Sequence, residues 1–190
     1  MDLILVTENR EIAQPLIDVA EKEDHRILKL IGTNQDVSGH VQSLCPDVLI
    51  FVSDEIDNLV LRQMKTITDK RATPMILFTR DSQSISIDAA VKAGATAYVV
   101  NCSNPERLNS LIDVARSRFA DQQQLKVELL NTRQALNDRK TVEKAKGIIM
   151  QTKNLSEEQA YTAIRKLAMN HNKRIGEIAE QIISAAEVLV

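Results

Sequence analysis

Five short runs of apolar residues, each followed by a helix-like stretch, occupy the first 118 residues of the chain. A strand that is apolar along its whole length is buried on both faces, as in a parallel sheet covered by helices. The alternation therefore predicts a doubly wound α/β domain over residues 1–118. The predicted strands are Leu3–Thr7, Arg26–Ile31, Asp47–Val52, Met75–Thr79 and Ala97–Val100, and the predicted helices are Glu11–Glu23, Gln35–Leu44, Asn58–Asp69, Gln83–Ala93 and Pro105–Arg118. Pro15 predicts a kink in the first helix, or a later start of that helix.

The last 85 residues contain no proline and only two glycines, Gly147 and Gly176. Proline inside a helix costs about 3 kcal/mol, so its absence indicates a mostly helical segment. We expect the helix that begins at Pro105 to continue past Arg118 as a linker over residues 119–140. A small all-α domain of three helices is expected over residues 141–190.

Apolar residues in the linker follow a spacing of three and four that is compatible with a coiled-coil seam. The seam residues are Ala115, Leu125, Leu129, Thr132 and Leu136, with interruptions at Arg118 and Gln122. The pattern predicts a homodimer in which Leu125, Leu129 and Leu136 contact a second copy. The alternative is a helix that packs on its own α/β domain.

Three helical patterns make up the predicted bundle. The first covers Lys140–Gln151, and the second begins at Ser156 and is expected to end near His171. The third begins near Ile175 and repeats apolar residues at helical spacing. The apolar stripe of the second pattern is Ala160, Ile164, Leu167 and Ala168.

Charge is unevenly distributed along the chain, although the formal net charge is only -2. Residues 1–118 hold 13 basic and 17 acidic side chains, whereas residues 133–174 hold 10 basic and 4 acidic ones. A basic segment of this kind predicts binding to a polyanion. The chain has no Trp, and Phe119 and Tyr161 are the only aromatic residues after residue 118, which argues against a domain that stacks bases on aromatic side chains.

Several protein classes are disfavoured by the sequence. The longest apolar run, Val48–Val52, is far shorter than the roughly 20 residues that span a bilayer. The N-terminus lacks the basic and apolar blocks of a signal peptide, so we expect a cytoplasmic protein. Cys45 and Cys102 stand alone, and no cluster of residues indicates a metal or a cofactor.

The α/β domain resembles the receiver domain of two-component response regulators, which has a flavodoxin-like fold. The resemblance covers residues 1 to about 118 and depends on ILVTEN, PDVLIFV, PMILFTR and GATAYVVNCSNPERL. In that family two acids hold Mg²⁺, an Asp accepts the phosphoryl group, and a Thr or Ser and a Lys complete the site. The corresponding residues of this sequence are Thr7, Glu8, Val52, Thr79 and Asn101, and Cys102 follows where Pro is usual.

These substitutions predict a degenerate phosphorylation site, because phosphoryl transfer needs a carboxylate nucleophile, a metal and a cation. Val52 cannot accept a phosphoryl group, and only one acid of the pair remains. Asp54 and Asp57 are conceivable substitutes, but loop acids that cap the next helix explain them better. We therefore expect a pseudo-receiver that binds another protein or dimerises.

The C-terminal region resembles the ANTAR domain, an RNA-binding module of bacterial transcription antiterminators. KAKGIIM, LSEEQAY and LAMNHNKRIGEIAE follow the pattern of that family in order and spacing between Val142 and Ile183. The whole arrangement resembles the nitrate/nitrite-assimilation and amidase-operon antiterminators. The resemblance implies a dimer that binds tandem hairpins in leader RNA and prevents formation of a terminator. It also implies that a ligand-sensing regulatory protein controls this dimer.

The basic residues of this segment are the candidate RNA contacts. The basic candidates are Lys144, Lys146, Lys173 and Arg174, followed by Arg139, Lys140, Lys153, Arg165 and Lys166, and the neutral Gln151 belongs with the first group. Gly147 lies in the middle of a predicted helix, where glycine is unfavourable, so its presence indicates a close approach to the backbone. Either a phosphate chain or a tightly packed partner helix fits that requirement.

Three other functions compete with RNA binding. A DNA-binding helix-turn-helix protein would need basic residues on its last helix, but residues 176–190 hold three Glu and no Lys or Arg. A protein-binding adaptor without a nucleic-acid role is compatible with the sequence. An enzyme is disfavoured, because His25, His40 and His171 lack a neighbouring nucleophile and no Gly-rich phosphate loop follows a strand.

Overall fold

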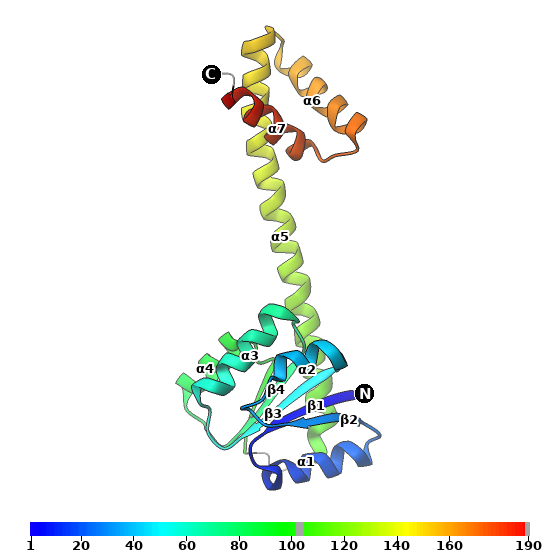
Figure 1. Ribbon diagram of the computed structural model, residues 1–190, viewed down its shortest axis with the longest axis vertical. Helices are drawn as coiled ribbons and strands as arrows, with labels where there is room; N and C mark the ends of the chain where they lie inside the picture. Colours follow the sequence, from blue (N-terminus) through cyan, green and yellow to red (C-terminus); the bar gives the residue numbers. More distant parts are fainter. Residues whose placement is uncertain (102–104, 189–190) are drawn as a thin grey trace. The chain divides into compact units, whose positions relative to one another are not determined.

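The computed structural model describes residues 1–101 and 105–188, and these form two compact units (Figure 1). Unit 1 comprises Met1–Gln123 and unit 2 comprises Gln124–Val190. One long helix contributes residues to both units. Cys102 lies outside the described residues.

Unit 1 contains a five-stranded sheet in which neighbouring strands are parallel and follow the order β2-β1-β3-β4-β5. The strands are β1 (Asp2–Thr7), β2 (Arg26–Ile31), β3 (Val48–Ser53), β4 (Met75–Thr79) and β5 (Ala97–Val100). Each boundary lies within one residue of its predicted position. The prediction of a doubly wound sheet is confirmed.

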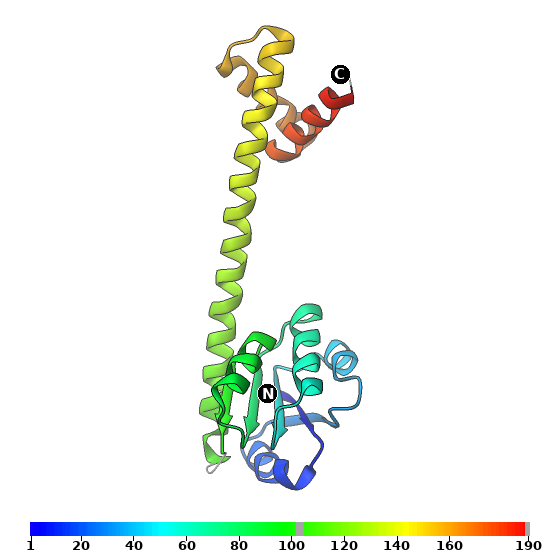
Figure 2. The same cartoon turned by 90° about the vertical axis from the view of Figure 1, so that its left-hand side faces the viewer.

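Helices cover both faces of the sheet (Figures 1 and 2). They are α1 (Arg10–Lys22), α2 (Val37–Leu44), α3 (Asn58–Lys70) and α4 (Ser84–Ala93), followed by a short 3₁₀ turn, η1 (Pro105–Arg107), and the start of α5 (Leu108–Lys153). One core cluster joins α1 and α5 to the sheet, and a second joins α2, α3 and α4 to its other face. The residues of β1, β3 and β4 are almost all buried, which explains why these three strands are apolar along most of their length.

Helix α1 departs from the sequence prediction at its N-terminal end. It begins at Arg10, capped by the side chain of Asn9, and Pro15 lies inside it, so a later start is wrong. Proline cannot donate its backbone hydrogen bond, which weakens the helix at this point. Burial of Leu16, Ile17 and two alanines of α1 in the core offsets that loss.

Helix α5 is unbroken from Leu108 to Lys153, as the absence of proline predicts. Leu108, Ile112 and Ala115 are buried in the core of unit 1. Ala115 therefore does not belong to a coiled-coil seam, and this part of the prediction is wrong. The helix packs on its own domain up to this point because these residues fall on the face that meets the sheet.

Unit 2 consists of the remainder of α5 with α6 (Glu157–His171) and α7 (Ile175–Val188). Its core contains Val142 and Ala145 of α5, Ile164 and Ala168 of α6, and Ile178 and Ala179 of α7. Helix α6 begins with a reciprocal capping box between Ser156 and Gln159 and ends at His171, as predicted. Leu167 is 40% exposed, so its assignment to the buried stripe is wrong. It lies at the edge of the buried face of α6, whereas Ile164 is fully buried in that face.

Candidate functional site

The first candidate site is the carboxyl edge of the sheet, where a receiver holds its phosphoryl group. Val52 stands at the acceptor position and is only 4% exposed, packed in the same core cluster as Phe78. The Thr79 hydroxyl donates to the Asp54 carbonyl oxygen at 2.9 Å and accepts from the Asp81 backbone N–H at 3.1 Å. The hydroxyl thus uses its donor and one of its acceptor sites within the protein.

The remaining acid of the family's metal pair has another partner. The Glu8 carboxylate accepts from the Thr33 hydroxyl and from the Asn34 backbone N–H, so it holds the loop between β2 and α2. Thr7, the other member of the pair, bonds to the backbone of Asn9 at the start of α1. Neither residue supplies a free carboxylate at the sheet edge.

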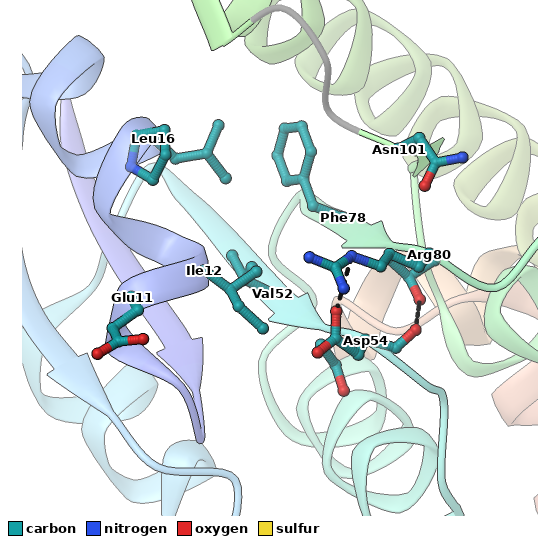
Figure 3. A pocket seen from close by; sticks show the side chains of 11 residues that line it. Glu11, Ile12, Leu16, Val52, Asp54, Phe78, Arg80 and Asn101 are labelled. Carbon is teal, nitrogen blue, oxygen red and sulfur yellow. Dashed lines mark hydrogen bonds and ion pairs between the residues drawn. The ribbon is translucent and has the colours of Figure 1, made fainter.

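A cavity of roughly 550 Å³ lies at this edge, and Figure 3 shows its lining. Its wall is apolar at Ile12, Leu16, Val52 and Phe78. Nε of Arg80 lies 3.1 Å from Oδ1 of Asp54, an ion pair whose geometry does not make a hydrogen bond. Asn101 also lines the cavity, and its backbone N–H donates to the Thr79 carbonyl at 2.9 Å.

The residues of this edge do not fit a phosphorylated aspartate with bound Mg²⁺. The acceptor is a buried valine, Glu8 is committed to a loop, and Arg80 neutralises Asp54. Over residues 1–101 and 105–188, no three His, Cys, Asp or Glu side chains gather as metal ligands. Asp57 caps α3 by accepting from the Val60 N–H at 2.8 Å, whereas Asp54 caps no helix and pairs with Arg80 instead.

The second candidate site is the cationic surface of unit 2. Nine of the ten candidate contact residues are exposed: Arg139, Lys140 and Lys144 on α5, Gln151 and Lys153 at its end, Arg165 and Lys166 on α6, and Lys173 and Arg174 in the turn before α7. Two of them have acidic partners on α7, since Lys144 lies 3.1 Å from Glu187 and Arg174 lies 3.3 Å from Glu177.

Lys146 differs from the other candidates because it is only 7% exposed. Its ammonium group lies 2.9 Å from Glu143 and 2.7 Å from Glu157, so it bridges α5 to the first turn of α6. Hydrogen bonds to Glu143 and Glu157 raise the pKa of Lys146. The same contact with Lys146 lowers the pKa of Glu157 below its ordinary value of 4.5. The structure gives Lys146 a role in holding the bundle together.

Part of the chain matches a known domain family. Residues 130–183 match the family model of the ANTAR domain. This segment is an ANTAR domain. The chain is 26% identical over 181 residues to the transcriptional regulatory protein PdtaR of Mycobacterium tuberculosis, which covers 95% of this chain and 88% of that protein. It is 39% identical over 74 residues to the nitrate regulatory protein of Klebsiella oxytoca, covering 39% of this chain and 19% of that protein.

Solved structures place the domain that precedes the ANTAR domain in the receiver fold. The receiver domain of a diguanylate cyclase from Desulfovibrio desulfuricans superposes with a TM-score of 0.55 at 15% identity, covering 64% of this chain and 97% of that one. A response regulator from Clostridium difficile gives a TM-score of 0.55 at 18% identity, with 62% and 97% covered. The chain thus combines a receiver-like domain with the ANTAR domain of transcriptional regulators. No helix in the described part of the chain is both long and apolar enough to cross a membrane.

Several features of both sites were not anticipated from the sequence. The pairing of Arg80 with Asp54 joins residues 26 positions apart, and the Lys146 bridge depends on how α6 returns along α5. The requirement for glycine at Gly176 arises because a Cβ there would collide with the Asp138 side chain. Only the charge of these residues, and the rarity of glycine in helices, gave a signal in the sequence.

We expect no phosphorylation of the receiver-like domain by a small phosphodonor. Incubation of the full chain with acetyl phosphate and Mg²⁺ should leave its intact mass unchanged, because the acceptor position is a valine. A receiver domain that retains its aspartate, treated in parallel, should gain the mass of one phosphoryl group. A phosphoryl group on Asp54 or Asp57 would contradict this prediction.

The Lys146 bridge should make stability depend on pH in a defined direction. Because the pKa of Glu157 is lowered in the folded state, the bridge contributes fully above pH 4.5 and is lost as pH falls through the folded pKa. Calorimetry should therefore show that Glu157→Gln lowers the melting temperature at pH 7, and that this loss becomes smaller as the pH falls from 4.5 to 3. Glu158→Gln is the matched control, since it removes a carboxylate from the same helical turn but not from the bridge. Equal effects of Glu157→Gln at both pH values would refute the role of the bridge.

Proposed function

We propose that this protein is an RNA-binding transcription antiterminator. Its ANTAR domain binds paired stem-loops in a leader RNA and thereby prevents a terminator hairpin from forming. The observation that carries the proposal is the set of exposed cations on α5, α6 and the turn before α7, within a domain that matches the ANTAR family. Cations of this kind bind the phosphate backbone and make affinity fall as salt rises.

The exposed face of α6 is the part of this cationic surface that best supports RNA binding, because its cations have no acidic partner among the described residues. Arg165 and Lys166 are exposed there, and Lys173 is exposed in the turn that follows. No ion pair of the described residues involves these three side chains. Lys153 is exposed at the end of α5 and adds a further positive charge. These unneutralised cations support binding to RNA phosphates, whereas we assign Lys146 to the stability of the bundle.

A DNA-binding function is less well supported. A helix-turn-helix protein inserts its last helix into the major groove, and this requires polar or basic side chains. Glu177, Glu180 and Glu187 stand on α7, and two of them are already paired with cations of the ANTAR domain. Their charge would repel the phosphates on either side of the groove.

The receiver-like domain is proposed to regulate the ANTAR domain by protein contact rather than by phosphate. A buried valine at the acceptor position and the pairing of Asp54 with Arg80 support this assignment. We further propose a cytoplasmic, non-enzymatic regulator that a ligand-sensing protein controls. The similarity to a nitrate regulatory protein favours a role in nitrate or nitrite assimilation.

The RNA-binding proposal is tested with the full chain and an RNA that carries two short stem-loops. Arg165→Gln combined with Lys166→Gln should weaken binding about tenfold and reduce the slope of log K against log salt by about 1–2. Lys126→Gln removes an exposed lysine of α5 outside the candidate set and should leave both quantities unchanged. Filter binding or fluorescence anisotropy over a salt titration measures them.

Loop-scrambled RNA and duplex DNA of the same sequence are the specificity controls. Preference for the paired stem-loops would support the antiterminator assignment. Equal and weak binding to all three nucleic acids would refute it and favour the adaptor function.

We also propose that the protein is a homodimer through α5. Leu125, Leu129 and Leu136 are 65%, 51% and 57% exposed, so no part of the described chain covers them. Their spacing of four and seven keeps them on one stripe of the helix, as in a coiled coil. A second copy of the same helix would bury all three.

Replacing seam leucines should dissociate this dimer. Leu129→Asn with Leu136→Asn should raise the dissociation constant at least roughly hundredfold, because each copy loses two buried leucines. Val127→Asn is the matched control: Val127 is 56% exposed on α5 but points away from the seam. Multi-angle light scattering across a dilution series gives the mass. A dimer that survives the double substitution, or a monomeric wild type, would contradict the proposal.

A further inference from the structure

Gly147 is a glycine that the fold itself does not require. It lies inside α5, and its backbone is not left-handed, since Gly94 is the one described glycine with positive φ. A Cβ added at Gly147 would meet nothing within 4 Å. By contrast, a Cβ at Gly176 would collide with Asp138, and one at Gly94 would collide with Thr68. Glycine destabilises a helix interior relative to alanine, so its use at Gly147 needs an explanation outside the folded chain.

Gly147 lies in a line of polar side chains along α5. Residues three and four apart are neighbours on a helix surface, so Lys140, Lys144, Gly147 and Gln151 form one line, here called the α5 row. Lys140, Lys144 and Gln151 are exposed. The α5 row spans twelve residues, or about 16 Å along the helix, which is enough to follow several phosphates of one strand.

A hollow of about 390 Å³ adjoins the α5 row between α5 and α7. Lys140 and Lys144 line it together with the hydroxyl-bearing Thr141 and Ser184, and Glu180 is its one acidic lining residue. The Lys144 ammonium also pairs with Glu187, but both side chains are more than 60% exposed. A surface ion pair of this kind contributes little, so a phosphate can replace Glu187 at Lys144.

A second copy of the helix explains Gly147 less well than a phosphate chain does. Extending the seam spacing beyond Leu136 leads to residues 139, 143 and 146, which are Arg, Glu and Lys, and not to Gly147. A helix packed tightly on the α5 row would also bury the ammonium groups of Lys140 and Lys144 away from water, which is costly. A phosphodiester strand instead neutralises both charges and gains from contact with the bare backbone.

We propose that the α5 row is the track of an RNA phosphodiester strand, and that Gly147 lets this strand lie directly against the helix. This inference rests on the proposed RNA-binding function and assigns the strand a place on the ANTAR domain. The missing Cβ allows the phosphates to come close to the helix at Gly147, and Lys140 and Lys144 contact them on the N-terminal side of Gly147. Gln151 contributes an amide donor at the far end of the α5 row.

The test exploits opposite effects of one substitution on stability and on binding. In the full chain, Gly147→Ala should raise the melting temperature by roughly 2–4 °C, since alanine favours the helix and meets no neighbour. The same variant should bind the two-stem-loop RNA about tenfold more weakly and lower its salt slope by about 1. Gly147→Leu should weaken binding further.

Two other variants serve as a control for helix stability and as a test of the Lys144 contact. Asn131→Ala strengthens the helix at an exposed position of α5 outside the α5 row, and should leave RNA binding unchanged. Glu187→Gln frees Lys144 and should strengthen RNA binding two- to fivefold or so. Both variants keep the lysines of the α5 row in place.

The outcomes separate this inference from the function on which it rests. If wild-type protein shows no preference for the stem-loop RNA, the proposed function fails and the inference falls with it. If wild type binds selectively and Gly147→Ala binds equally well, the inference alone is overturned. A loss of dimer mass in Gly147→Ala, measured by light scattering, would assign Gly147 to a partner helix and would also overturn it.

Discussion

One unbroken helix, α5, supplies part of the core of both units, and the rest of the protein depends on its continuity. Leu108 and Ile112 are buried against the sheet, whereas Val142 and Ala145 are buried against α6 and α7. Burial of a leucine or isoleucine contributes about 1.5–3 kcal/mol, so neither core is complete without its part of α5. Between these parts Leu125, Leu129 and Leu136 of α5 are exposed. The absence of proline after Pro105 is the condition for this arrangement.

The receiver-like domain has the receiver fold, but a buried valine occupies the position of the phosphoryl-accepting aspartate. The carboxyl ends of β3 and β4 still meet at one edge, where doubly wound proteins place their ligands. A buried valine, a threonine bonded to the backbone and an arginine paired with Asp54 occupy that edge. Glu8 stabilises a neighbouring loop instead of coordinating a metal. The edge therefore carries a valine where a receiver carries its phosphoryl-accepting aspartate.

The ANTAR domain contains cations that pair with its own acids and cations that face solvent without such a partner among the described residues. Lys146 joins α5 to α6, and Arg174 and Lys144 pair with acids of α7. Arg165, Lys166 and Lys173 are left to the solvent-facing surface. This separation explains how a chain with a net charge of -2 can present a cationic surface. The acids of α7 pair with Lys144 of α5 and with Arg174 of the turn, and no ion pair of the described residues involves the cations of α6.

Local patterns were sufficient to predict the elements and the class of each domain. The apolar run of β4 predicted both of its ends correctly, because a strand buried on both faces shows its burial in the sequence alone. The ANTAR motif identified the second domain because its sequence signals are contiguous between Val142 and Ile183. The role of Lys146, the loop held by Glu8 and the open space beside Gly147 depended on tertiary structure. The sequence does not show whether a charged side chain is paired or solvated, or whether a glycine has a close neighbour. Both depend on which helices and strands pack against that residue in the folded chain. The sequence prediction also failed at two other residues. Core packing of α1 outweighed the tendency of Pro15 to end a helix, and the place of Leu167 at the edge of the buried face of α6 leaves it exposed.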